Sequence, residues 1–213
     1  MIRDSTCYIA VLALIAIYLI YQDEIDSFVS KSPVCNSVDG RCYKVVEKFE
    51  QSRQASELLA LLNAQCVKLM RHLRNKYLWS YSDNQRAKDI VTFLLSNYNQ
   101  DGIVENAPNS DVNTSYVDDK GKVFAICLRE KQSGKNMFHK IDELMFVVLH
   151  EMSHMATFSY GHETDFWTNF KFLLTEAKEA GIHNPVDYSK VPINYCSLKV
   201  DYNPYFDKKL EVI

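Results

Sequence analysis

The chain has no excess of positive charge. Its 213 residues include 24 lysines and arginines against 27 aspartates and glutamates, which gives a net charge of −3 and a pI near 6.1. General nucleic-acid binding requires a strongly basic surface, so this balance argues against that class of function. One local basic cluster exists, which we interpret as the solvated face of a helix. It comprises Lys68, Arg71, Arg74 and Lys76.

The sequence also lacks internal repeats and low-complexity segments, which excludes repeat architectures and long disordered tracts. Hydrophobic residues make up 47% of the chain, enough for a substantial core. A length of 213 residues suits one globular domain and one membrane segment.

Charge is absent from one apolar run near the N-terminus, "CYIAVLALIAIYLIY" at residues 7–21. The run is slightly shorter than the roughly 20 residues of a typical transmembrane helix. A signal peptide is the alternative, but no small-x-small cleavage site follows the run. We therefore expect an uncleaved single-pass membrane anchor over residues 1–24, a stalk over 25–35 and one globular domain over 36–213.

Six cysteines leave the redox compartment open. Cys35 and Cys42 bracket the turn-like stretch "NSVDGR" and could close a small disulfide loop. Cys66, Cys127 and Cys196 fall in segments that we interpret as core, where free cysteine is common.

Hydrophobic periodicity predicts an α+β domain. Apolar stripes at helical spacing run through residues 47–79, the segment after Ser82-Asp83, and residues 141–158 and 163–180. Polar residues at 99–113 predict a loop, and "TSYVDDKGKVFAICLRE" predicts a hairpin that turns at 119–121. The tail after Gly181 shows little regular pattern.

The most informative motif is His150-Glu151-Met152-Ser153-His154, an H-E-x-x-H sequence inside the strongly apolar helix expected at 141–158. Positions i and i+4 of a helix share one face, so His150 and His154 can hold one Zn²⁺ ion from the same side. Glu151 is offset by one position, which directs its carboxylate toward a water in the open coordination position.

A catalytic zinc site takes a third protein ligand and keeps one position open. We expect His162 to be this ligand, because Gly161 lets the chain turn back toward the helix. Competing ligands are Glu163, Asp165, Glu176 and His183. A fourth ligand, Glu163 or Asp165, would instead make the site structural, and the least specific alternative is that the histidines are ordinary core and surface residues.

This arrangement predicts hydrolysis of a peptide bond. Glu151 would act as the general base toward water and then protonate the leaving amine. The sequence does not select the group that stabilises the oxyanion from several candidates. The strand at 122–128 either pairs with an extended substrate or is an ordinary sheet strand. The oxyanion candidates are Tyr116, Tyr160, His183 and Tyr195.

The stretches "LHEMSH" and "GHETDFW" resemble the zinc peptidases of the WLM and SprT-like group. Further blocks across residues 36–205 resemble the WLM-like proteins encoded by large DNA viruses: "SVDGRCYKV", "ASELLALL", "SYVDDKGKVFAICLRE", "LMFVVLHEMSHMAT", "GHETDFWTNFKFLLTEA" and "DYSKVPINYC". The resemblance implies a zincin-like fold, zinc bound by His150, His154 and His162, and Glu151 as the catalytic glutamate. It also implies a membrane protein of the virion inner membrane or of an internal host membrane.

The chain departs from the better-known relatives, which cleave proteins crosslinked to DNA and carry basic DNA-binding or ubiquitin-binding segments. It has neither kind of segment, and its spacing from His154 to His162 differs from that of some relatives. We therefore expect a protein or peptide substrate without a DNA-repair role. The alternative function is a structural virion protein that retains the zincin fold and tethers the membrane to capsid or other virion proteins.

Overall fold

A mixed five-stranded sheet organises the domain, in the strand order β1-β2-β3-β5-β4. The strands are β1 (Lys31–Cys35), β2 (Cys42–Val46), β3 (Ile103–Glu105), β4 (Tyr116–Asp118) and β5 (Val123–Ile126). β2, β3 and β5 run parallel to one another, and β1 and β4 pair antiparallel at the two edges. The computed structural model describes residues 11–18, 31–47, 49, 51–106, 114–130 and 137–213.

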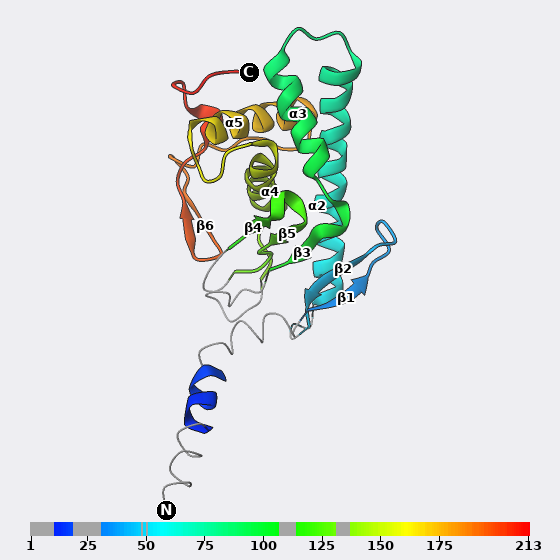
Figure 1. Ribbon diagram of the computed structural model, residues 1–213, viewed down its shortest axis with the longest axis vertical. Coiled ribbons are helices and arrows are strands. Elements are labelled where there is room, and N and C mark those ends of the chain that lie inside the picture. Colours follow the sequence, from blue (N-terminus) through cyan, green and yellow to red (C-terminus); the bar gives the residue numbers. More distant parts are fainter. Residues whose placement is uncertain (1–10, 19–30, 48, 50, 107–113, 131–136) are drawn as a thin grey trace, which may run out of the picture.

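Helices pack over this sheet and against one another (Figure 1). They are α2 (Ser52–Leu73), its π-helical continuation η1 (Arg74–Trp79), α3 (Gln85–Asn97), α4 (Ile141–Ala156) and α5 (Thr164–Glu179). α2 contacts β1, β2 and β3, and α4 contacts α2, α3 and α5. The expected α+β class is confirmed, and each helix lies where the apolar periodicity predicts one.

The two most apolar helix faces form the core. On α2, the predicted stripe is fully buried from Leu62 through Cys66 and Leu69 to Leu73. On α4, every side chain from Leu144 to Leu149 is buried. A helix that is hydrophobic on nearly all sides must be surrounded by protein, and the three neighbouring helices surround α4. Polar groups on α4 therefore reach solvent only where this enclosure opens.

Two sets of strands differ from the expectation. β3 lies inside the predicted loop 99–113, and the tail contains a hairpin of β6 (Ile193–Tyr195) and β7 (Leu198–Val200). These segments are three residues long, which is too short to show a period. β3 also ends in Glu105, which is fully buried. Its carboxylate accepts hydrogen bonds from Arg129 Nε at 2.7 Å and from the Val46 amide at 2.8 Å, which offset the cost of burial.

Two disulfides connect segments of the domain. Cys35–Cys42 closes the β1–β2 hairpin, as the spacing of these residues suggested. Cys127–Cys196 joins the segment after β5 to the β6–β7 turn; the sequence placed both cysteines in the core but did not predict this pairing. Cys196 and Ser197 have φ values of 46° and 72°, which is the backbone of a two-residue type I′ hairpin turn. Among the described residues, Cys66 is a free cysteine and is buried.

The structure contradicts the expected N-terminal transmembrane helix and, with it, the expected single-pass membrane localisation. No helix of the described residues is long and apolar enough to cross a membrane. Within the expected anchor, the described residues 11–18 are helical. The rest of the expected anchor, residues 1–10 and 19–24, lies outside the described residues. The stalk expected at 25–35 overlaps β1, so the sheet already begins at Lys31.

Candidate metal site and catalytic groups

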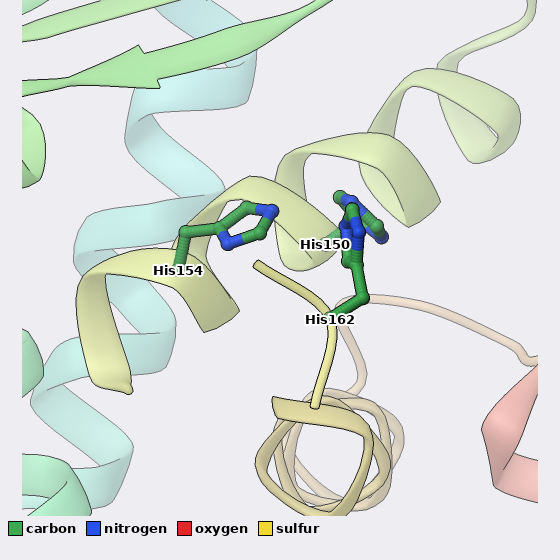
Figure 2. Close-up of side chains that lie close together, drawn as sticks. All are labelled: His150, His154 and His162. Atoms are coloured by element: carbon green, nitrogen blue, oxygen red, sulfur yellow. The ribbon is translucent and has the colours of Figure 1, made fainter. Parts of the chain in front are cut away.

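Helix α4 carries the first three groups of the site. His150 and His154 lie one turn apart with ring centroids 5.2 Å from each other. Both are half-buried, whereas Glu151 between them is only 5% exposed. α4 ends at Ala156, and the chain then reverses through Gly161, whose φ of +82° favours a residue without a side chain. This reversal brings His162 back over the helix (Figure 2).

The three imidazoles converge on one point. The Nε2 atoms of His150 and His162 are 3.0 Å apart, and one ring nitrogen from each of the three histidines lies within 4.8 Å of the others. Two nitrogens at tetrahedral positions on zinc, each about 2.05 Å from the ion, are separated by about 3.3 Å. The donor set and its spacing therefore fit a zinc ion bound by His150, His154 and His162.

Burial keeps these imidazoles in the neutral form that binds metals. Desolvation and the neighbouring histidines lower the pKa of His150 to about 3. Desolvation lowers the pKa of His154 to about 4, with His162 and Lys120 adding to the effect. Desolvation also lowers the pKa of His162. All three rings are therefore uncharged at neutral pH, with a lone pair available to a cation.

Glu151 is the buried carboxyl of the site. Burial raises the pKa of its carboxyl to about 8. A cation beside it would favour the ionised form and so oppose that shift. A pKa near the working pH is the condition under which a carboxylate both accepts and returns a proton efficiently.

The competing ligands take other positions. Asp165 accepts hydrogen bonds from Ser159 Oγ at 2.6 Å and from the Phe166 amide at 2.9 Å, at the start of α5. Glu176 belongs to a separate cluster with His72, Lys76 and Tyr77. His183 is 3% exposed, and neither of its ring nitrogens has a hydrogen-bond partner among the described residues. Glu163 precedes α5 as an exposed residue outside the histidine cluster.

An open cleft of about 560 Å³ lies over the histidines and Glu151. Its other walls are β4 with the residues beside it (114–120) and the segment 159–162 that carries His162. Among the oxyanion candidates, Tyr116 and Tyr160 line this cleft. Tyr195 is buried and donates its hydroxyl hydrogen to the Cys127 oxygen at 2.7 Å. The sequence therefore named four candidates, of which two face the cleft.

Lys120 is a residue of the cleft that sequence reasoning missed. Its Nζ donates to the backbone oxygens of Thr157 at 2.8 Å and of Phe158 and Ser159 at 3.3 Å. These carbonyls belong to the residues that directly follow α4, so Lys120 gives them hydrogen-bond donors and holds the segment that leads to His162. No local signal marked it, because a lysine in the polar turn "DDKGK" has the pattern of a solvated residue.

The chain is similar to proteins of large DNA viruses. It is 29% identical over 177 residues to the uncharacterized protein R325 of Acanthamoeba polyphaga mimivirus, covering 80% of this chain and 82% of that protein. It is 26% identical over 200 residues to the uncharacterized protein 136R of Invertebrate iridescent virus 6, covering 92% and 99%. A third relative, the uncharacterized protein 042R of Invertebrate iridescent virus 3, is 35% identical over 79 residues, covering 36% and 46%. No family model and no solved structure matches the chain.

Proposed function

We propose that this protein is a zinc-dependent peptidase of the WLM and SprT-like type. The observation that carries the proposal is the meeting of three neutral histidines and a buried glutamate at the floor of one open cleft. The chemistry of the donors supports zinc, because imidazole nitrogens suit this ion and the H-E-x-x-H spacing leaves a coordination position open. Bound zinc would polarise a peptide carbonyl and make water a better nucleophile.

Glu151 moves the proton in this reaction. Its carboxylate takes a proton from the attacking water as oxygen bonds to the carbonyl carbon. When the carbon–nitrogen bond breaks, the same carboxyl returns that proton to the leaving amine. Tyr116 and Tyr160 line the cleft, and either hydroxyl could donate a hydrogen bond to the negatively charged oxygen.

The edge strand β4 supports an extended substrate in the cleft. For the segment 122–128 the sequence left two roles open, pairing with substrate or an ordinary sheet strand. This segment contains β5, which lies between β3 and β4 and has both sides occupied. Among the described strands, β4 instead has a partner on one side only, and it borders the cleft. A peptide that added to β4 would gain backbone hydrogen bonds and run past Glu151.

The first test is Glu151→Gln in the full-length chain. This variant preserves shape and removes the base, so zinc content should stay at that of wild type while peptide cleavage falls by about 100-fold or more. Glu163→Gln is the matched control, since Glu163 is exposed and next to the site; it should retain both properties. Unchanged cleavage by Glu151→Gln would remove this carboxylate from the mechanism.

The second test is His162→Ala, measured by zinc content and by competition with a chelator. Loss of an outer partner of a metal ligand typically weakens metal binding 10- to 100-fold, so loss of a ligand should cost more than about 100-fold. Full zinc retention would exclude His162 as a ligand. Zinc binding by wild type without cleavage of any peptide would instead refute the peptidase and favour a scaffold function.

A further inference from the structure

A second cavity of about 230 Å³ adjoins the catalytic cleft. The two cavities share Thr114, His150, Glu151 and Leu198 as lining residues, so one opens beside the other at the catalytic glutamate. The walls of the second cavity come from α4, α5 and the β6–β7 hairpin with the residues that follow it. The principal wall residues are Phe146, Val147, Trp167, Phe170, Val200 and Tyr202.

Aromatic rings form a large part of this wall. The rings of Phe146 and Phe170 lie 5.2 Å apart, and those of Trp167 and Tyr202 meet edge to face at 5.2 Å. Such surfaces favour another aromatic ring in an offset or edge-to-face arrangement. A closed apolar cavity of roughly 150 Å³ is sufficient to hold benzene, so a cavity of 230 Å³ has room for a phenyl or phenol group.

The charged residues in the lining of this cavity do not favour a charged ligand. Lys199 and Asp201 also line the cavity, but they pair with each other at 3.1 Å, and their side chains are 64% and 55% exposed. They therefore form a neutral rim. The remaining carboxylate in the lining is Glu151, which the reaction uses. An uncharged apolar group is the occupant that leaves no charge buried without a partner.

We propose that this cavity binds an aromatic side chain, phenylalanine or tyrosine, of the substrate residue directly beside the bond that is cleaved. The inference rests on the proposed peptidase function, because the cavity meets the cleft at Glu151. It makes Val200, Trp167 and Phe170 residues that determine specificity. The protein is then a peptidase for chains with an aromatic residue at one fixed position next to the scissile bond.

The first experiment is cleavage of a random peptide library by the full-length zinc-loaded protein, with sequencing of the products. Peptides with phenylalanine or tyrosine at one flanking position should be cleaved at least about 10-fold faster than those with alanine, the size of effect that apolar pockets produce. Val200→Phe narrows the cavity from the hairpin side and should abolish the preference. Val191→Phe, at an exposed valine outside the cavity, is the matched control and should retain it. Cleavage without aromatic enrichment at either flanking position would overturn the inference while leaving the peptidase intact.

A binding measurement separates the two proposals if no peptide is cleaved. The chain has two tryptophans, and Trp79 is 70% exposed, so Trp79→Phe leaves Trp167 in the cavity wall as the fluorescent reporter. Titration with N-acetyl-phenylalaninamide should give a saturable change in emission, at least about 10-fold tighter than with N-acetyl-alaninamide. Val200→Phe should remove this response. No response to the phenylalanine probe, or an equal response to both probes, would overturn the aromatic site.

Discussion

The disulfide between Cys127 and Cys196 should contribute much more stability than the one between Cys35 and Cys42. Both cysteines of the first pair are fully buried, and the pair closes a loop with a sequence separation of 69 residues, against 7 for the second. Loop-closure entropy then gives about 4.4 kcal/mol for the longer loop and about 2.4 kcal/mol for the shorter one. The expected difference in free energy of unfolding is about 2 kcal/mol.

The assay is urea denaturation of the oxidised wild type beside two double variants, C127A/C196A and C35A/C42A. Reduction of the wild type opens both disulfides but removes no sulfur atom. It therefore controls for the side-chain volume that the alanine variants lose. Reduced C35A/C42A, in which only the long loop opens, should lose about 4 kcal/mol relative to the same variant oxidised. A loss below about 1 kcal/mol in that comparison would refute the loop-entropy argument, as would equal losses in the two double variants.

The same disulfide fastens the hairpin that forms one wall of the aromatic cavity. Leu198 and Val200 belong to β7, and Cys196 lies in the turn before it. Reduction should therefore also weaken the binding of the phenylalanine probe, and C35A/C42A should show this weakening on reduction as the wild type does.

Two further predictions concern buried ionisable groups. Glu105→Gln should lower the free energy of unfolding by about 3–5 kcal/mol, because it leaves the Arg129 guanidinium, 1% exposed, without its carboxylate. Replacement of both residues, by Leu at 105 and Met at 129, should recover most of that loss in urea denaturation. Equal losses in the single and double variants would contradict the ion-pair account. Burial lowers the pKa of His183 in the folded protein, with partial opposition from Asp142. The unfolded chain then binds more protons below about pH 6.5, so His183 should lower the free energy of unfolding as the pH falls through that value. His183→Leu should flatten this slope relative to wild type, and an unchanged slope would exclude the contribution.

The long periodic elements could be predicted from the sequence because their signals are local. The stripe from Leu62 to Leu73 on α2 and the turn at 119–121 between β4 and β5 lie where the residue pattern predicts them. In contrast, β3 becomes a strand only because β2 and β5 lie on either side of it. The Asn, Asp, Gly, Ser and Pro content of residues 99–113 predicted a loop, and nothing local indicated that Glu105 would be buried beside Arg129, which is remote in sequence.

The anchor shows the opposite failure, in which a local signal was overvalued. Residues 7–21 form an uncharged apolar run, yet apolar composition states only that a segment avoids water. It does not determine whether a segment spans a membrane, and no helix of the described residues is long and apolar enough to do so.

By itself, the sequence determined the local chemistry of this protein. H-E-x-x-H within an apolar helix places two imidazoles on one face with a glutamate beside them, because the helical repeat alone fixes positions i, i+1 and i+4. Only the tertiary structure decided which residues join them. The approach of His162, the contact of Lys120 with the end of α4, the bond between Cys127 and Cys196 and the aromatic cavity beside Glu151 all unite segments distant in the chain. Such contacts depend on how the helices and the sheet pack together, and no periodicity in the sequence encodes them.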